Sequence, residues 1–387
     1  MIRNLTARYA VTQFSYWAAA MGAASFATTY LLDRGLNAGL IGFLLAFSGI
    51  LACLTNPILA SFADRARKYI LPQLMLGLSA LCLLCFALQL LPGLPVLAAG
   101  ILYILGLWSS DAIIPLLNAL NVACDQSGYP INFGVARGIG SVASATSALV
   151  LGHILARFGS VWMFVFLIFF RIVCMVAIAG FPKLQKQLPT QSCADTSCSI
   201  GQFFLRYKWF CLSLLGISCL GMFHAMTETY LIVIMERLGG DSSNVGTALF
   251  ISSLAGAPVL FFFSFFRKRL KDESLLKISA LTFLLKSVLF CIAPAIGFIY
   301  ALELLQTTSY GFLSPTQVFY AGSRVRSVDM VKGQAFIATA YTLGCSGGNF
   351  VGGQLINISV DTMLYAGIAM ALTGAVILFL TLKKSDI

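Results

Sequence analysis

Apolar runs of about twenty residues recur along the whole chain, with short polar breaks between them. A helix of about 20 apolar residues is long enough to cross the hydrocarbon core of a bilayer. The runs lie at residues 9–31, 39–62, 70–91, 95–118, 133–156, 159–181, 209–233, 244–266, 274–295, 298–320, 332–356 and 359–381. The sequence therefore predicts an all-α polytopic membrane protein with twelve transmembrane helices.

Composition favours a membrane protein over a soluble one. Hydrophobic residues make up 59% of the 387 positions and charged residues only 10%, whereas soluble domains carry about 25% charged residues. Residues 1–10 lead into an apolar run without an early small-residue cleavage pattern, so we expect the first helix to be retained. The net charge of +11 could indicate a nucleic-acid partner, but the placement of the basic residues argues against one.

Basic residues collect in alternate breaks between the runs. With a cytoplasmic N-terminus, nineteen of the 25 lysines and arginines fall on the inner side, including the clusters at residues 65–68 and 267–271. The positive-inside rule then places both termini in the cytoplasm. The basic residues thus indicate topology and not a nucleic-acid partner. We expect a multi-pass protein of a bacterial inner membrane, and we expect it to be monomeric.

The longest polar break, residues 183–207, divides the runs into two sets of six. We interpret it as a cytoplasmic linker between two pseudo-symmetric six-helix bundles, residues 1–182 and 208–387. Pro57 in the second run and Pro258 in the eighth are each followed by a basic cluster, and small residues concentrate in the fifth and eleventh runs. Such duplicated bundles are typical of transporters that rock two halves about a central site.

Arg137 is a costly charged residue inside a predicted span. An arginine at the centre of a membrane helix costs about 2.5–3.5 kcal/mol, so it needs a partner, a wet cavity or a substrate. Asp111 and Arg137 are equally distant from the break between the fourth and fifth spans, so we expect them at one depth on neighbouring helices. They are candidates for substrate binding, and Asp111 also for proton coupling; a purely structural ion pair is the alternative.

A second acid–base pair is expected in the C-terminal half. Lys286 and Glu303 lie at similar distances on either side of the break near Pro294, so they can meet. His224 and Glu228 are four positions apart and share one helix face. A carboxyl that gains and loses a proton beside a cation suits a proton-coupled carrier. Glu228 and Glu303 are therefore predicted proton-coupling residues, although each pair could simply lock helices together.

Further polar and aromatic side chains in the spans are candidates for substrate contacts. Ligand sites place a few hydrogen-bonding groups against apolar walls. The complete set of predicted substrate-binding residues is Arg137, Asp111, Arg171, His224, Lys286, Gln306, Asn349, Asn118, Tyr16 and Trp17. For most of these, helix packing is the alternative role.

Three stretches of the chain resemble the major facilitator superfamily, and within it the lactose-permease-like branch of oligosaccharide, nucleoside and phenylpropionate proton symporters. They are residues 35–42 with residues 60–68, residues 133–141, and residues 332–335. The resemblance implies a twelve-helix alternating-access carrier, a substrate contact by Arg137, and a cytoplasmic gate formed by Asp64 and Arg65. Asn118 and Ser144 depart from the sugar-permease pattern and weaken a disaccharide assignment.

We therefore expect a proton-coupled symporter that takes up a small polar organic solute, which binds between the halves. A saccharide or nucleoside is the first candidate, and an organic or aromatic acid is the second. The alternatives are a proton-coupled exporter of amphipathic compounds and a non-transporting membrane sensor or assembly factor. No phosphate-binding glycine loop or metal-ligand spacing is present in the sequence, so we expect neither an enzyme nor a cofactor.

Overall fold

The computed structural model describes residues 5–65, 71–127, 129, 131–182 and 199–382, and every regular element in these ranges is helical. These residues form two compact units. The first unit comprises the described parts of Met1–Asn37, Phe47–Pro189 and Gly240–Phe250. The second comprises Ala38–Ala46 and the described parts of Thr190–Gly239 and Ile251–Ile387. The predicted linker lies mostly outside the described residues.

The first unit is built from eight helices and the start of another. They are α1 (Leu5–Ser25), α2 (Ala27–Asp33), most of α3 (Ala38–Arg65), α4 (Leu71–Leu88), α5 (Val96–Asp111), α6 (Ile113–Gln126), α7 (Phe133–Phe158), α8 (Trp162–Ala179) and the first turns of α12 (Ser242–Arg269). Helix α1 packs against α7 and α8, and α4 packs against α5 and α8. Buried side chains of α1, α6 and α8, among them Tyr9, Leu120 and Ile178, form its main apolar core.

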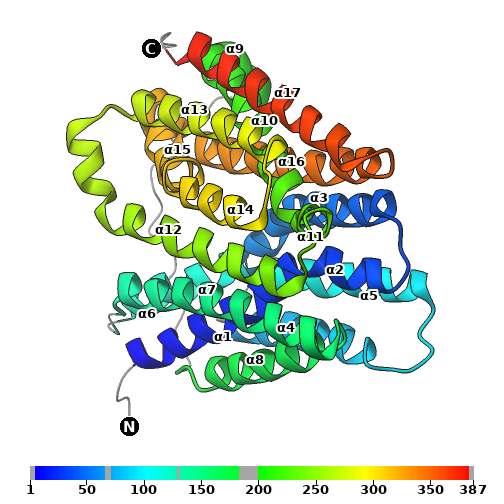
Figure 1. The fold of residues 1–387 in the computed structure, drawn as a ribbon. Helices are drawn as coiled ribbons and strands as arrows, with labels where there is room; N and C mark the ends of the chain where they lie inside the picture. The colour runs from blue at the N-terminus through cyan, green and yellow to red at the C-terminus, as the bar shows by residue number, and fades with distance from the viewer. Residues whose placement is uncertain (1–4, 66–70, 128, 130, 183–198, 383–387) are drawn as a thin grey trace. The chain divides into compact units, whose positions relative to one another are not determined.

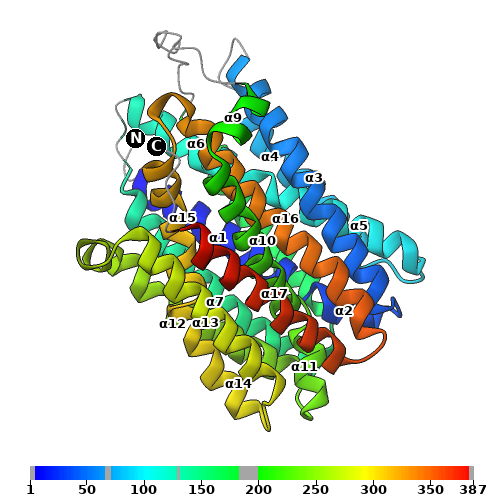
Figure 2. The ribbon, with the colours of Figure 1, turned by 90° about the horizontal axis from the view of Figure 1, so that it is seen from above.

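The second unit repeats this packing with later helices. Its elements are α9 (Ile200–Arg206), α10 (Lys208–Thr229), α11 (Leu231–Arg237), the rest of α12, α13 (Asp272–Cys291), α14 (Ile296–Glu303), the 3-10 helix η1 (Leu304–Thr307), α15 (Tyr310–Arg324), η2 (Ser327–Asp329), α16 (Met330–Ile356), α17 (Val360–Thr381) and the start of α3. Helix α10 packs against α16 and α17 (Figures 1 and 2), and α13 packs against α15 and α17. Thus α10, α16, α17 and α13 pair as α1, α7, α8 and α4 do.

The helices confirm the expected fold class. Among the residues that the structure describes, eight helices are long and apolar enough to cross a membrane, and the two segments of α12, bent by 59°, could form a ninth span. The other predicted spans are divided between shorter helices or, like α16, are rich in glycine and polar residues. The protein is an all-α polytopic membrane protein, and the number twelve stays a prediction.

Breaks divide four of the predicted spans. The first span is broken at Phe26, the fourth at Ala112, the seventh at Tyr230 and the tenth between α14 and α15. If the twelve predicted spans are grouped in threes along the chain, each break falls in the first span of a group. Breaks in membrane helices are common at the binding sites of transporters, although backbone hydrogen bonds continue through Phe26 and Ala112 here. The breaks therefore identify where a functional site should be sought.

Glycines on α16 let it lie directly against α10. A Cβ atom added to Gly344 would meet the main chain of Ser218, and one added to Gly348 would meet the main chain of Met222. Small residues allow such close helix contacts in membranes. The small-residue pattern of the eleventh predicted span therefore serves helix packing and fixes the depth of α16 relative to the break at the end of α10.

The predicted cytoplasmic gate is described only in part. Asp64 and Arg65 form the last residues of α3, as the sequence favours for the end of the second span. Their side chains lie outside the described part of the chain, as do residues 66–70 that follow. Their role in gating stays a prediction.

Candidate functional site

A buried ion pair lies at the break of the tenth predicted span. The Lys286 ammonium on α13 donates to Glu303 Oε2 at 2.9 Å and to Gln306 Oε1 at 3.1 Å. Lys286 is 1% exposed and Glu303 3% exposed, so each charge depends on the other for compensation. The prediction that Lys286 and Glu303 meet is confirmed, and Gln306 joins them.

Serine hydroxyls hold the backbone of this break. Helix α14 ends at Glu303, and the chain continues through η1 to Ser309. The Ser309 hydroxyl donates to the carbonyl oxygen of Leu305 at 2.9 Å, and Ser279 on α13 donates to the carbonyl oxygen of Ser309 at 2.7 Å. Because α13 provides both Ser279 and Lys286, it fixes the backbone and the charge of the break together.

His224 and Glu228 lie on the same face of α10, near the break of the seventh predicted span. His224 Nε2 is 4.0 Å from Glu228 Oε1, as expected from their spacing. The imidazole stacks on the ring of Tyr310, with ring centroids 5.1 Å apart and planes 16° apart. Lys286 interacts electrostatically with both His224 and Glu228. The lysine therefore links the two acids.

We call this group, His224, Glu228, Lys286, Glu303 and Gln306, the polar cluster of the second unit. All five were predicted site residues, and one unit brings them together. Glu228 differs from Glu303 within it, because its side chain is 30% exposed while that of Glu303 is 4% exposed. The cluster thus contains one carboxyl held by lysine and one that is more accessible.

Asn349 on α16 contacts the end of α10. Its side-chain Oδ1 accepts a hydrogen bond from Thr229 Oγ1 at 2.7 Å, and its carbonyl oxygen accepts one from the Tyr230 hydroxyl at 2.6 Å. Thr229 directly follows Glu228 in the chain. The structure therefore places Asn349 where it supports the break beside Glu228.

The first unit buries Arg171 beside the break of the fourth predicted span. Arg171 Nη2 donates to Ser110 Oγ at 2.6 Å, and the guanidinium lies 5.5 Å from the ring centroid of Tyr16. The Tyr16 hydroxyl donates to the carbonyl oxygen of Ser110 at 2.9 Å. Asp111, the last residue of α5, interacts electrostatically with Arg171. Arg171 is completely buried, and its Nε and Nη1 atoms have no hydrogen-bond acceptor among the described residues.

Arg137 belongs to a different network on α7 and α1. Its guanidinium lies 4.2 Å from the ring centroid of Trp17, and Nη1 donates to Ser141 Oγ at 3.2 Å. Trp17 Nε1 donates to Gln13 Oε1 at 2.9 Å, and Gln13 Nε2 donates to the Tyr9 hydroxyl at 2.9 Å. This series of contacts fixes the indole, which in turn supports the guanidinium by a cation–π contact.

The sequence paired Asp111 with Arg137, whereas the structure brings Arg171 to Asp111. Asn118, another predicted substrate contact, is exposed on α6. Sequence reasoning missed Ser110, which binds Arg171, and Tyr310, which stacks on His224. No sequence signal distinguished these two, because serine and aromatic residues are common throughout the spans.

Each of the three predicted proton-coupling acids lies at a helix end. Asp111 is the last residue of α5, Glu303 is the last residue of α14, and Glu228 is the penultimate residue of α10. Asp111 interacts electrostatically with Arg171, and Glu228 and Glu303 both interact with Lys286.

Comparisons with known proteins agree with this architecture. The model of the MFS_1 like family matches residues 6–366. The crystal structure of the nucleoside transporter NupG is similar to this chain with a TM-score of 0.83 and 14% identity, over 98% of both chains. A POT family transporter in complex with 5-aminolevulinic acid has a TM-score of 0.71 and 13% identity, over 98% of this chain and 96% of that chain. No curated protein sequence matches the chain.

At identities this low, the two solved structures show a shared fold only. The family match is independent of them and extends over nearly the whole chain, from the first described helix into α17. Together with the apolar helices, it identifies an integral membrane transporter rather than an enzyme. The chain belongs to the MFS_1 like family of the major facilitator superfamily, as the resemblance of its loop and helix motifs implied.

Proposed function

We propose that this transporter takes up a small polar organic solute together with protons by alternating access. The observation that carries the proposal is the polar cluster of the second unit, in which Lys286 bonds Glu303 and also interacts with His224 and Glu228. A carrier that couples two fluxes needs a group whose charge depends on what is bound near it. Lys286 interacts with both Glu228 and Glu303, so the charge on one acid affects how strongly the lysine attracts the other.

Glu228 is the proposed proton carrier. Glu303 already accepts a 2.9 Å hydrogen bond from Lys286, whereas the Glu228 side chain is more exposed and lies 4.0 Å from His224. A proton on Glu228 removes its attraction for Lys286 and leaves the Lys286–Glu303 pair intact. Loss of that proton restores a second negative charge beside the lysine. Glu303 and Asp111 are the other candidates, each held by its own cation.

Each unit has aromatic and cationic groups that we propose as candidates for substrate recognition. In the first unit, Arg137 and Trp17 offer a charge beside a flat ring, and Arg171 and Tyr16 repeat that combination deeper in the helices. In the second unit, His224 stacked on Tyr310 is a further flat surface. Flat surfaces next to hydrogen-bonding groups suit a planar solute with polar substituents, such as a nucleoside. A saccharide shares this first place, and an organic or aromatic acid is second.

The similarity to NupG supports a nucleoside among these choices, since that protein is named as a nucleoside transporter. The distribution of basic residues supports an orientation with both termini in the cytoplasm, and a bacterial inner membrane is the location that we propose. We further propose that Asp64 and Arg65 act in a cytoplasmic gate and that the chain works as a monomer. The two predicted bundles, 1–182 and 208–387, would then be its moving parts.

Solute-dependent proton movement tests the proposal directly. Cells or proteoliposomes that contain the protein are given nucleosides, saccharides or carboxylates in turn, and the external pH is recorded. Proton-coupled uptake predicts that the external medium becomes alkaline with one class of solute. Glu228→Gln should abolish that signal while leaving counterflow of labelled solute across the membrane. The matched control is Glu236→Gln, an exposed glutamate on α11, which should behave as wild type.

Two outcomes would contradict uptake symport. Solute-dependent acidification of the external medium would mean that the added solute enters in exchange for protons that leave. That is the reverse mode of a solute–proton antiporter, which would export its solute in the forward mode. Labelled solute that accumulates without any proton movement would remove the proposed role of Glu228, even if the substrate class were right. The absence of any flux for all three classes would favour a sensor.

A further inference from the structure

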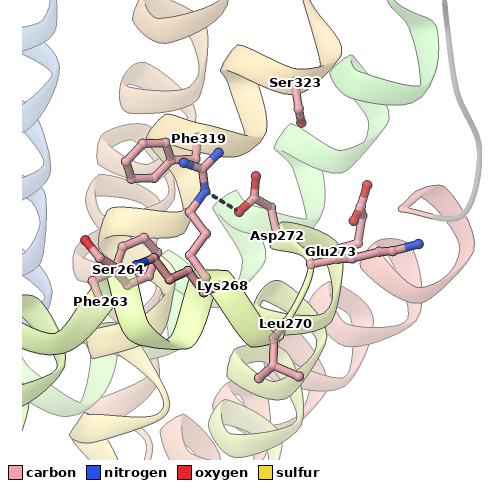
Figure 3. Close-up of a pocket in the computed structure, with 10 residues that line it drawn as sticks. Phe263, Ser264, Lys268, Leu270, Asp272, Glu273, Phe319 and Ser323 are labelled. Atoms are coloured by element: carbon pink, nitrogen blue, oxygen red, sulfur yellow. Dashed lines mark hydrogen bonds and ion pairs between the residues drawn. The ribbon is translucent and has the colours of Figure 1, made fainter.

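A charged cavity lies at the basic end of α12, within the second unit. It has a volume of about 520 Å³ and lies between the end of α12, the start of α13 and one face of α15 (Figure 3). Its charged walls are Arg267, Lys268, Lys271, Asp272 and Glu273. Cavities of this size accommodate small-molecule ligands or the headgroup of a lipid. None of these residues belongs to the polar cluster.

Both acids of the cavity are already paired. Asp272 Oδ1 lies 3.1 Å from Arg267 Nε (Figure 3), and Glu273 Oε1 lies 2.8 Å from Arg324 Nη2. The Arg267 guanidinium also lies 3.8 Å from the ring centroid of Phe319. These contacts fix the walls of the cavity. They also cancel its negative charges, so the acids do not make it a cation site.

Lys268 and Lys271 supply the remaining charge. Both side chains are exposed and line the cavity, and neither forms an ion pair with any residue that the structure describes. The hydroxyl side chains of Ser264 and Ser323 line the same space. Two free ammonium groups beside hydroxyls are suited to the oxygen atoms of a phosphate. The positive charge of the cavity therefore favours the binding of an anion that carries a phosphate.

The surface beside the cavity is apolar and aromatic. The last part of α12, Phe262–Arg269, is bent by 59° from the preceding part. It exposes 64% of Phe262 and 49% of Phe265, and the Arg269 guanidinium lies 4.2 Å from the ring centroid of Phe265. Aromatic side chains next to basic ones are typical of the boundary between lipid and water. A soluble phosphate compound would gain nothing from this surface, whereas acyl chains would.

We infer that this cavity binds the headgroup of an anionic phospholipid of the phosphatidylglycerol class. The phosphate accepts hydrogen bonds from Lys268 and Lys271, the glycerol hydroxyls lie by Ser264 and Ser323, and the acyl chains run along Phe262 and Phe265. Basic pockets between membrane helices on the cytoplasmic side bind anionic headgroups in this manner. The inference does not depend on the transported solute.

Lipid binding to the purified full-length protein tests this site. Phosphatidylglycerol is titrated into protein in a neutral detergent, and its binding is followed by native mass spectrometry and by the shift in melting temperature. A lysine beside an anionic phosphate contributes roughly fivefold in affinity, so Lys268→Ala/Lys271→Ala should weaken binding roughly 30-fold. Phosphatidylcholine, which has no net charge, is the lipid control and also reports whether each variant is folded.

A matched variant removes two other basic residues. Lys208 and Arg326 are both exposed near basic helix ends of the same unit and lie outside the cavity. Lys208→Ala/Arg326→Ala should keep phosphatidylglycerol affinity within about threefold of wild type, because it changes general charge but not the site. Equal losses in the two double variants would overturn the inference and indicate non-specific attraction.

A soluble probe separates the two sources of phosphate. Glycerol 3-phosphate carries the same phosphate and glycerol but no acyl chains. Under the inference it gives no measurable shift at concentrations at which phosphatidylglycerol saturates. If it binds as tightly as the lipid, and Lys268→Ala/Lys271→Ala removes that binding, the cavity is a site for a soluble phosphate compound and the lipid assignment is wrong.

Discussion

Replacing Lys286 by methionine should leave a negative charge without compensation inside the second unit. The ammonium is 1% exposed and holds Glu303 Oε2 at 2.9 Å and Gln306 Oε1 at 3.1 Å. Removing one partner from a buried ion pair costs about 3–5 kcal/mol, because the remaining charge has lost its solvent and its partner. The expected cost of Lys286→Met therefore lies within this range.

Thermal unfolding of the purified protein in detergent measures this cost. A domain of about 150–250 residues loses about 2–4 °C in melting temperature per kcal/mol, so a cost of about 3–5 kcal/mol corresponds to about 6–20 °C. Arg237→Met is the matched control, because the Arg237–Asp361 pair is largely exposed, with side chains 41% and 46% accessible. Such pairs contribute about 0–1 kcal/mol. The control should therefore change the melting temperature by a few degrees at most.

A double variant separates a lost ion pair from lost packing. Lys286→Met/Glu303→Met removes both charges and keeps apolar side chains of similar length. Replacing a whole buried ion pair by apolar residues is often neutral or stabilising. We expect the double variant to recover most of the stability that Lys286→Met loses. A double variant as unstable as the single one, or a single variant no worse than Arg237→Met, would refute the electrostatic account of this site.

Three further predictions concern other parts of the chain. Arg137→Ala should abolish binding of the transported solute in a thermal-shift assay, and unchanged affinity would remove Arg137 from the site. Gly348→Val should lower the free energy of unfolding by about 1–3 kcal/mol, because the new side chain collides with the main chain of Met222. A lower melting temperature would report this loss. The hydrogen bond from the Ser243 hydroxyl, at 2.6 Å, lowers the pKa of Asp241 from its ordinary value of 3.8. The charged form of Asp241 therefore stabilises the folded protein at pH values above the pKa that this carboxyl has in the unfolded chain. The melting temperature of wild type should exceed that of Asp241→Ala by its largest amount near neutral pH, and this difference should shrink below about pH 4.

The sequence predicts the helices well because lipid imposes a length and a composition on them. In its described residues each predicted span is occupied mainly by helix, and the pairing of Lys286 with Glu303 follows from their similar distances, eight and nine residues, from Pro294. Depth along a hairpin is readable from sequence, because each residue of a helix adds a fixed rise. The direction in which a side chain faces around its helix depends on how the helices pack, so it is harder to predict from the sequence.

Asp111 shows this difference. The hairpin arithmetic expects Asp111 and Arg137 at one depth, but it does not give the direction in which either side chain faces. Arg171, from the sixth predicted span, is the cation that interacts with Asp111. The breaks themselves were not predicted, because the residues around them, such as Ala112 and Tyr230, carry no strong helix-breaking signal.

The acids Asp111 and Glu303 show how the duplicated units have diverged. Asp111 ends the first part of the fourth predicted span, and Glu303 ends the first part of the tenth, so the acids occupy equivalent places in the repeated packing. Their cations do not, since Arg171 lies on α8 and Lys286 lies on α13. The repeated fold thus places an acid at the same point of each unit, whereas the helix that supplies its cation differs between the units.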